Sequence, residues 1–289
     1  MAVTLAFIGF GEAGAAFAGD VPAQGYDSKT DDAQTRAAKL ADFAAAGVTA
    51  CDSAADALSG AQAVLSLVTA DQALAAAQAG AKSIATGTLW FDMNSVAPET
   101  KRAAAAAIEA PGGRYVDVAV MAPVHPKRMG VPLLVSGPHA AEGARALKDI
   151  GFHDVSVVDG PVGAASSIKM IRSVMVKGVE ALTAECLLAA EAAGVTEAVI
   201  ASLDASSPSP GWQARADYNL DRMMVHGLRR AAEMEEVVAT LEALGTGSAM
   251  ARATIARQRA IGALELTPPD GLAAKLGALL PIHEKARAA

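Results

Sequence analysis

Cysteines and aromatic residues are scarce in this chain of 289 residues. Aromatic side chains make up 4% of it, and its two cysteines are Cys51 and Cys186. Two cysteines cannot form the disulfide framework on which small secreted domains depend. Since both lie in apolar, alanine-rich stretches, we expect reduced thiols that pack inside the protein. The shortage of aromatic rings predicts an aliphatic core, which suits closely packed helices.

Dense positive charge and long apolar runs are also missing. Lys and Arg number 24 against 31 Asp and Glu, a formal net charge of −7, and no basic cluster interrupts this balance. We therefore expect no binding to nucleic acid or to anionic membranes. No apolar run reaches the roughly 18 residues of a transmembrane helix, and no basic segment of a signal peptide precedes the first apolar one. These absences predict a cytoplasmic protein.

Apolar residues make up 52% of the sequence, and their pattern changes near residue 160. Before this point, short apolar runs typical of buried parallel strands alternate with helix-like segments, and afterwards only helix-like segments follow. This order predicts an α/β protein with an N-terminal doubly wound Rossmann sheet, residues 1–162, and an all-α C-terminal domain, residues 163–289. The second domain begins with a long helix over residues 166–193. Apolar residues on nearly every face of this helix predict that it is mostly buried.

The boundaries of the other elements follow from the same patterns. One strand is expected to end at Asp27, and the others cover residues 3–9, 48–51, 63–68, 89–93, 115–120, 133–136 and 155–159. In the second domain we expect helices over 196–203, 249–263 and 271–288, one or two helices over 218–244, and a loop over 206–211.

The first apolar run leads into a glycine-rich turn, Gly9-Phe10-Gly11-Glu12-Ala13-Gly14. A G-x-G-x-x-G between a strand and a helix is the pattern of a dinucleotide-binding turn. Gly9 allows the tight turn, Gly11 lets a pyrophosphate approach the backbone, and Gly14 lets the helix pack against the strand. The phosphates are then expected at the free N–H groups of the helix N-terminus.

Asp27 lies eighteen residues after Gly9, at the expected end of the second strand. A carboxylate here accepts a hydrogen bond from the ribose 2′-OH of NAD and repels the 2′-phosphate of NADP. Ser28 and Lys29 follow directly, and an inward Lys29 would favour NADP. We predict NAD as the preferred cofactor and leave NADP as the alternative. Val68 and Thr69 follow another strand and are candidate cofactor contacts, because ligands bind beyond the carboxyl ends of such strands.

Lys169 lies in the first turn of the long helix, and Ser173 follows four residues later on the same face. A lysine that enters a buried helix either extends its charged end to solvent or takes part in chemistry. The pattern of the helix alone leaves both interpretations open.

Four segments together resemble the β-hydroxyacid dehydrogenase superfamily, which includes 3-hydroxyisobutyrate, tartronate semialdehyde and 6-phosphogluconate dehydrogenases. They are residues 9–14, 92–98 and 117–123, and the helix start that carries Gly163, Lys169 and Ser173. The resemblance covers residues 5–193 in matching order. Residues 222–236 resemble a subgroup of phosphogluconate dehydrogenase-like proteins with a distinct helical C-terminal domain.

The resemblance implies hydride transfer between a hydroxyl-bearing carbon of a small substrate and a nicotinamide. Lys169 would take the hydroxyl proton during oxidation and return it during reduction, and a lowered pKa would suit that role. Ser95 would hold the substrate or the nicotinamide ribose, and Asn94 would contact the cofactor. Ser173 would be a second catalytic residue beside Lys169 and would also contact the substrate. The family also implies a homodimer.

The sequence departs from the family in the segment that binds the substrate carboxylate. The family has Ser-Gly-Gly there, and this chain has Met121-Ala122-Pro123, which offers fewer hydrogen-bond donors. His125 could replace the lost polar contacts or could face solvent. Ser173 replaces a usual asparagine, and Val176 replaces the glutamate of true 6-phosphogluconate dehydrogenases. The first change leaves open a bulkier carbonyl or an imine as substrate. A non-catalytic dinucleotide sensor is the third reading, although binding alone would not need Lys169.

In the C-terminal domain, His226, Arg229, Arg230 and Glu233 have the spacing of one helix face. This face is either solvated, with an Arg229–Glu233 ion pair, or a cationic patch in which His226 and Arg229 bind an anionic substrate. The spacing does not decide between the two. The five histidines are scattered without ligand spacing, so we expect no metal.

Overall fold

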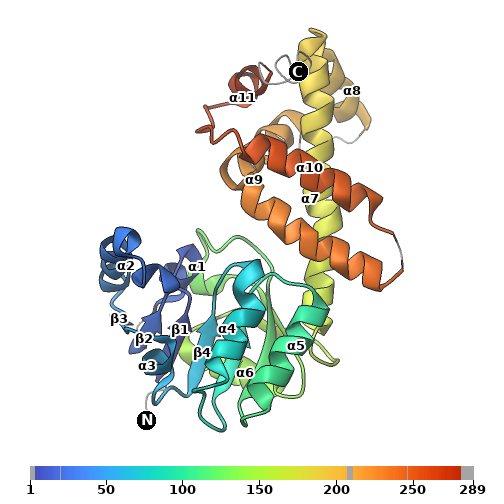
Figure 1. Ribbon diagram of the computed structural model, residues 1–289. Helices are drawn as coiled ribbons and strands as arrows, with labels where there is room; N and C mark the ends of the chain where they lie inside the picture. The colour runs from blue at the N-terminus through green and yellow to red at the C-terminus, as the bar shows by residue number, and fades with distance from the viewer. Residues whose placement is uncertain (1–3, 20, 207–210, 246, 281–289) are drawn as a thin grey trace. The chain divides into compact units, whose positions relative to one another are not determined.

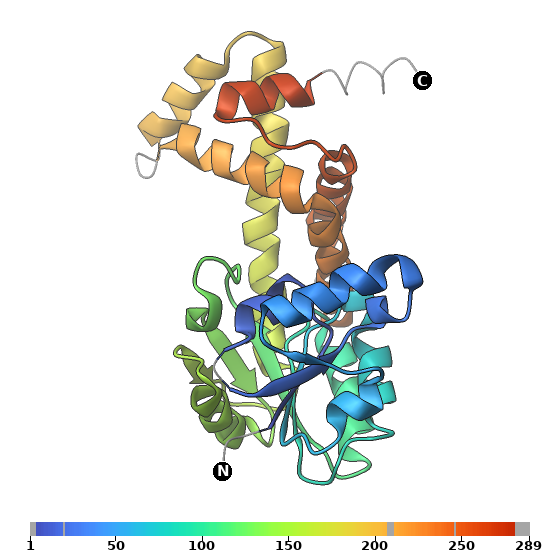
Figure 2. The ribbon, with the colours of Figure 1, turned by 90° about the vertical axis from the view of Figure 1, so that its left-hand side faces the viewer.

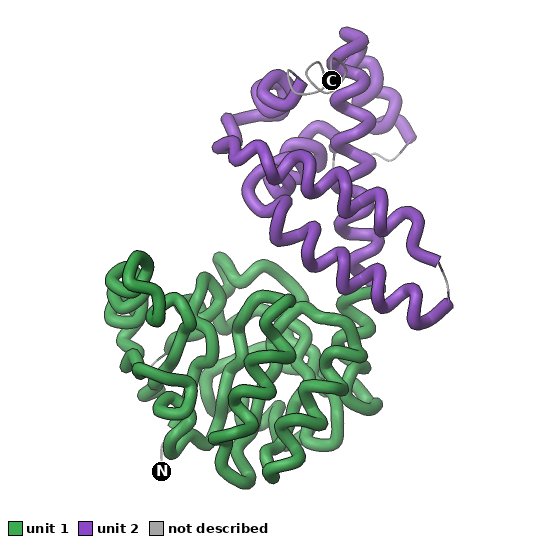
Figure 3. The backbone as a smooth tube through the Cα atoms, viewed as in Figure 1, with its two compact units in different colours: residues 1–170 green, residues 171–289 purple. Residues whose placement is uncertain are grey.

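The computed structural model describes residues 4–19, 21–206, 211–245 and 247–280. The chain forms two compact units, residues 1–170 and 171–289 (Figure 3). The boundary lies inside one continuous helix, α7 (Ala164–Ala192). The sequence places this whole helix in the second domain, whereas in the structure its first turns, with Lys169, belong to the first unit.

The first unit is built on an eight-stranded sheet in the order β3-β2-β1-β4-β5-β6-β7-β8 (Figure 1). All neighbouring strands are parallel except β6 and β7, which are antiparallel. The strands are β1 (Leu5–Ile8), β2 (Ala23–Tyr26), β3 (Thr49–Ala50), β4 (Ala63–Ser66), β5 (Leu89–Asp92), β6 (Arg114–Val120), β7 (Leu133–Ser136) and β8 (Val155–Val157). The predicted doubly wound sheet is confirmed. The reversal between β6 and β7 was not predicted.

Helices cover both faces of this sheet (Figure 2). One face carries α1 (Glu12–Phe17), α2 (Ala33–Ala45) and α6 (Ala140–Ile150), and the other carries α3 (Ala54–Leu58), α4 (Ala73–Gly80) and α5 (Pro98–Glu109). Three short 3-10 helices occur in the loops, namely η1 (Ser28–Thr30), η2 (Ala70–Gln72) and η3 (Arg128–Gly130). Local sequence signals start several helices: Asp32 and Ser53 accept backbone N–H bonds as N-caps, and Pro98 begins α5.

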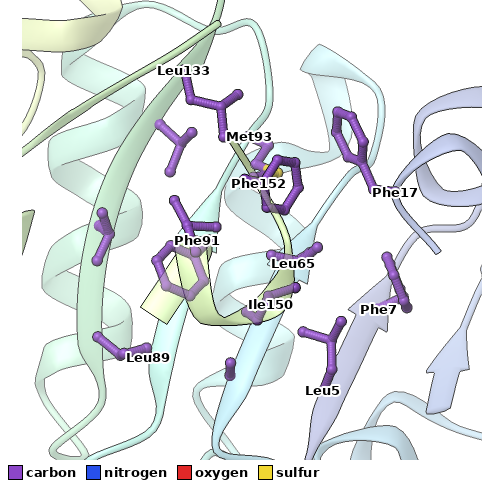
Figure 4. Packing of buried hydrophobic residues seen from close by; sticks show 14 of the residues in the cluster. Leu5, Phe7, Phe17, Leu65, Leu89, Phe91, Met93, Leu133, Ile150 and Phe152 are labelled. Carbon is purple, nitrogen blue, oxygen red and sulfur yellow. The ribbon is translucent and has the colours of Figure 1, made fainter. Parts of the chain in front are cut away.

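The composition predicted an aliphatic core, and the core of the first unit instead combines aliphatic side chains with aromatic rings. All six phenylalanines of the chain lie in the apolar cluster between the sheet and α1, α2 and α6. Figure 4 shows Phe7, Phe17, Phe91 and Phe152 among the aliphatic side chains of this cluster. The phenylalanine rings are concentrated in this layer, where they form edge-to-face and stacked pairs. Trp90 and Tyr115 lie in the apolar cluster on the other face of the sheet.

The second unit consists of helices in its described residues. After the remainder of α7 come α8 (Thr196–Ser206), α9 (Trp212–Ala243), α10 (Ala249–Gly262) and α11 (Leu272–Leu279). The segment predicted as one or two helices is the single helix α9, which begins six residues earlier than expected. Residues 207–210 of the expected loop and residues 281–288 of the expected closing helix lie outside the described residues.

Helices α9 and α10 pack closely where Gly227 meets Gly262. A Cβ atom on Gly227 would lie 2.5 Å from the backbone oxygen of Gln258 and 2.7 Å from the Cα of Gly262. Only glycine at both positions allows the backbones to approach this far.

Helix α7 was predicted to be mostly buried, but in the single chain one side of it is exposed. In the second unit, Ile171, Met175 and Leu182 are 48%, 67% and 55% exposed. Their spacing places them along one stripe of the helix. Cys186 is exposed as well, so the expectation that it packs in the core is wrong. Cys51 packs partly against the apolar cluster between the sheet and α3, α4 and α5.

None of the helices in the described part of the chain combines the length and the apolar character needed to cross a bilayer.

Candidate active site

The glycine-rich turn lies between β1 and α1, at the carboxyl edge of the sheet. Gly9 has φ +83°, and a Cβ atom there would lie 2.6 Å from the backbone oxygen of Leu67. A Cβ on Gly14 would lie 2.9 Å from the ring of Phe10. Over Gly11, in contrast, a Cβ would meet nothing within 4 Å. The turn is therefore closed on its inner side and open where a pyrophosphate would approach the backbone, so its geometry fits a dinucleotide.

Asp27 follows β2 and closes onto this turn. Its Oδ2 accepts a hydrogen bond from the backbone N–H of Phe10 at 2.7 Å, and its Oδ1 accepts one from that of Lys29 at 2.9 Å. Each carboxylate oxygen keeps a lone pair that can accept a ribose hydroxyl. Ser28 and Lys29 are exposed.

Asn94, at the end of β5, is buried and turned toward the protein. Its Oδ1 accepts the backbone N–H of Val68 at 2.7 Å, and its Nδ2 donates to Asp92 Oδ1 at 2.8 Å and to Ser66 Oγ at 3.1 Å. These bonds join the loop after β4 to the loop after β5. The predicted cofactor contacts Val68 and Asn94 thus hold one another in place, and Thr69 beside them is exposed.

Lys169 and Ser95 meet directly, although 74 residues separate them. Lys169 Nζ donates a hydrogen bond to Ser95 Oγ at 2.5 Å, and both residues are half-buried. Ser95 follows β5 and Lys169 lies in the first turns of α7. The structure therefore brings the lysine to the same edge of the sheet as the glycine-rich turn.

Beneath this pair lies a row of polar residues that crosses the sheet. In the strand register Ser66 is opposite Asp92, Asp92 is opposite Asp117, and Asp117 is opposite Ser136. Lys101 of α5, fully buried, donates to Asp92 Oδ1 at 3.0 Å and lies 3.5 Å from Asp117 Oδ1. The sequence reasoning missed this cluster. The available signal was an acidic residue inside each of two apolar strands, which must find a partner when buried.

Tyr115 belongs to the same cluster. Its hydroxyl donates to Asp92 Oδ2 at 2.6 Å. Burial, followed by the charge of Asp92 and this hydrogen bond, raises the pKa of Tyr115 well above its ordinary value. The phenol therefore stays protonated and keeps its role as a donor at all pH values of interest.

The predicted substrate loop connects the antiparallel strands β6 and β7. Met121 donates its backbone N–H to Pro132 O at 2.9 Å, and Ala122 packs partly against the apolar cluster. Pro123 and His125 are exposed. Because β6 ends at the carboxyl edge, this loop begins on the same side of the sheet as Ser95.

The four residues predicted to share one face of α9 have different surroundings in the structure. Arg230 is buried and bound to Glu180, and Lys177 lies 2.8 Å from Glu233. His226 and Arg229 instead line a groove of about 700 Å³ formed with Gly262 and residues 265–268. Burial, followed by the nearby charge of Arg230, lowers the pKa of Arg222. Ser173 is also in this unit, and it is buried.

Within the described residues, no group of three or more His, Cys, Asp or Glu side chains is arranged to hold a metal ion.

The doubly wound sheet, the glycine-rich turn and the acidic residue after β2 define a dinucleotide-binding protein. The NAD binding domain of 6-phosphogluconate dehydrogenase matches residues 4–151, and a domain of unknown function, DUF1932, matches residues 190–261. The chain belongs to the β-hydroxyacid dehydrogenase superfamily. It is accordingly an oxidoreductase that uses a nicotinamide cofactor.

Individual relatives agree with this family. The 3-hydroxyisobutyrate dehydrogenase of Pseudomonas aeruginosa is 30% identical over 220 residues, which cover 72% of this chain and 71% of the relative. A conserved hypothetical protein of Sinorhizobium meliloti has a solved structure with 39% identity and a TM-score of 0.75, covering 98% of this chain and 97% of that one. The 3-hydroxyisobutyrate dehydrogenase of Mycobacterium tuberculosis, solved with L-serine, shares the fold at 18% identity and a TM-score of 0.73, covering 99% of each chain.

Proposed function

We propose that this protein oxidises the hydroxyl group of a small hydroxy acid or related alcohol, or reduces the corresponding carbonyl, with Lys169 as the general acid and base. The observation that carries the proposal is the 2.5 Å hydrogen bond between Lys169 Nζ and Ser95 Oγ. It places an ionisable group beside a hydroxyl at the edge of the sheet where the glycine-rich turn would hold a dinucleotide. The first unit then serves as the cofactor domain and the helical unit as the substrate and dimerisation domain.

The cofactor, Lys169 and Ser95 have different roles in the proposed reaction. A bound nicotinamide supplies the acceptor or donor of the hydride. Lys169 Nζ removes the proton of the substrate hydroxyl as the carbonyl forms, and it returns that proton in the opposite direction. Ser95 Oγ orients the amine toward the reacting oxygen. Among the other predicted substrate contacts, the loop from Met121 to His125 offers few hydrogen-bond donors for a carboxylate. A cationic residue such as Arg229 would suit an anionic substrate.

The test is a substrate screen of the purified protein, which follows the absorbance of the reduced nicotinamide. We expect turnover with at least one hydroxy acid or alcohol in the oxidative direction. Turnover with cyclic imines only, in the reductive direction, would contradict the proposed substrate class. Cofactor binding without turnover of any compound would instead favour the sensor.

We expect NADH to bind more tightly than NADPH, because the Asp27 carboxylate lies against the glycine-rich turn and would repel a 2′-phosphate. Asp27→Ala should weaken NADH binding about tenfold or more and should reduce the preference for NADH over NADPH. Nicotinamide fluorescence titration measures both affinities. Asp31→Asn is the control. It neutralises another carboxylate of the same loop, one that accepts a hydrogen bond from the Tyr26 hydroxyl and does not bind the glycine-rich turn. Tighter binding of NADPH by the wild-type protein would mean that Lys29 governs the site.

We also expect a homodimer, whose interface includes the exposed apolar stripe of α7. Such a stripe is rarely left in water on a single chain. Met175→Glu, which introduces a charge at a residue that is 67% exposed, should give monomers at micromolar concentration in light scattering while the helix content stays unchanged. Met250→Glu is the control, because Met250 is 61% exposed but lies on α10. A monomeric wild-type protein would contradict the prediction.

A further inference from the structure

Asp117 caps the helix that carries Lys169. Its Oδ2 accepts the backbone N–H groups of Gly163 at 3.0 Å and of Ser166 at 3.2 Å, and its Oδ1 accepts the hydroxyl of Ser166. Ser136, opposite Asp117 in the strand register, donates to the same carboxylate at 3.0 Å. A fully buried carboxylate thus satisfies donors that the start of α7 would otherwise leave unpaired.

The partner of Lys169 is held by the same cluster from the other side. Ser95 follows Asn94, whose backbone N–H and side-chain amide both donate to Asp92 Oδ1, at 3.0 and 2.8 Å. Lys101 Nζ bonds Asp92 and lies 3.5 Å from Asp117. The result is a closed ring of contacts. From Lys169 it runs through Ser95, along the chain to Asp92, through Lys101 to Asp117, and back along one turn of α7.

The charges in this ring favour a fixed arrangement of its members. Asp92 and Asp117 are both fully buried, and each would be costly without a cation or hydrogen-bond donors. Lys101, itself without exposed surface, serves both of them. Any displacement of α7 or of the loop after β5 would leave a buried charge poorly satisfied, so both ends of the Lys169–Ser95 hydrogen bond are fixed.

We infer that Asp117 is a positioning residue for the reaction: through Ser166 and Lys101 it fixes the distance between Lys169 Nζ and Ser95 Oγ. This role rests on the proposed function of Lys169. Asp117 bonds the start of α7 rather than supplying the reacting group, and it acts by holding the first turns of α7 against the end of β5.

The test compares Asp117→Asn and Ser166→Ala with the control Ser167→Ala. Ser167 lies in the same turn of α7, but its hydroxyl donates to the backbone oxygen of Gly163 and not to Asp117. We expect kcat to fall about 100-fold in Asp117→Asn and about tenfold in Ser166→Ala, because small displacements of a catalytic group are costly. The Kd for NADH should stay within about twofold of the wild-type value, and Ser167→Ala should leave both quantities unchanged.

A second readout does not depend on turnover. Mass spectrometry measures the rate at which acetic anhydride modifies each lysine. In both variants we expect Lys169 to be modified several-fold faster than in the wild-type protein, because it is released from Ser95, while the buried Lys39 and Lys177 stay protected. Faster modification of all three lysines would indicate general unfolding and would overturn the specific positioning role of Asp117. An unchanged kcat together with unchanged modification of Lys169 in folded Ser166→Ala would also overturn it. A wild-type protein without turnover would contradict the proposed function alone, and the acetylation rates would then decide the positioning role.

Discussion

Replacing Lys169 with alanine is expected to lower kcat about 10³-fold, since a positioned general acid or base contributes roughly 10²- to 10⁴-fold to a rate. The change removes the amine that meets Ser95 Oγ and leaves the glycine-rich turn and Asp27 intact. The Kd for the preferred nicotinamide cofactor should therefore change by less than about threefold. Initial rates with the substrate found in the screen, together with a fluorescence titration, measure the two quantities separately.

Two further variants sharpen this result. Lys82→Ala removes an exposed lysine from the same unit and should keep the wild-type kcat. Ser95→Ala keeps the amine but removes its partner, so kcat should fall by less than in Lys169→Ala. If Lys169→Ala retained more than about a tenth of the wild-type kcat, the lysine would not be the general acid and base.

Replacing Arg230 with alanine is expected to lower the free energy of unfolding by about 3–5 kcal/mol, because it leaves Glu180 buried without its cation. Arg230 donates to both oxygens of Glu180, and Gln258 Nε2 donates to Oε2 at 2.9 Å. The side chains of the ion pair are 10% and 4% exposed, so the remaining carboxylate would be largely shielded from bulk solvent. Urea denaturation followed by circular dichroism measures the loss.

The exposed ion pair Arg259–Glu235 provides the control. Its side chains are 55% and 53% exposed, and Arg259→Ala should cost less than about 1 kcal/mol. Exchanging Glu180, Arg230 and Gln258 together for methionine should recover most of the stability, because a buried ionic group can be replaced by apolar residues of similar size. If Arg230→Ala and Arg259→Ala cost the same, the buried pair is not a determinant of stability.

Local signals in the sequence were sufficient for the fold class and for the cofactor turn. Strand-like and helix-like segments alternate up to residue 160, and G-x-G-x-x-G stands between the first two of them, so the doubly wound sheet could be predicted from neighbouring residues alone. The caps Asp32 and Ser53 and the helix start at Pro98 are likewise local, because each depends on a single turn of backbone. The family resemblance selected Lys169 and Ser95, but it did not place them in contact.

The exposure of α7 and the division of the face around Arg230 were not predictable in this way. An apolar residue in a helix can face the protein's own core or a solvent-exposed stripe, and sequence periodicity does not distinguish the two when apolar residues occur all round. Met175 is an example: the composition of α7 predicted that it is buried, but in the structure it is exposed. Spacing along α9 likewise did not identify the partner of Glu233. This residue lies beside Lys177, which is 56 positions away in the sequence.

The sequence by itself determined which segments are strands and helices and where a dinucleotide would approach, because those properties depend on residues within one or two turns of each other. Only the tertiary structure decided the strand register, which aligns Ser66, Asp92, Asp117 and Ser136 in one row. It also decided the fold of α7 back to β5, which brings Lys169 to Ser95 across 74 residues. These pairings depend on how distant strands and helices satisfy one another's buried charges, and that requirement is met only when the whole unit has folded.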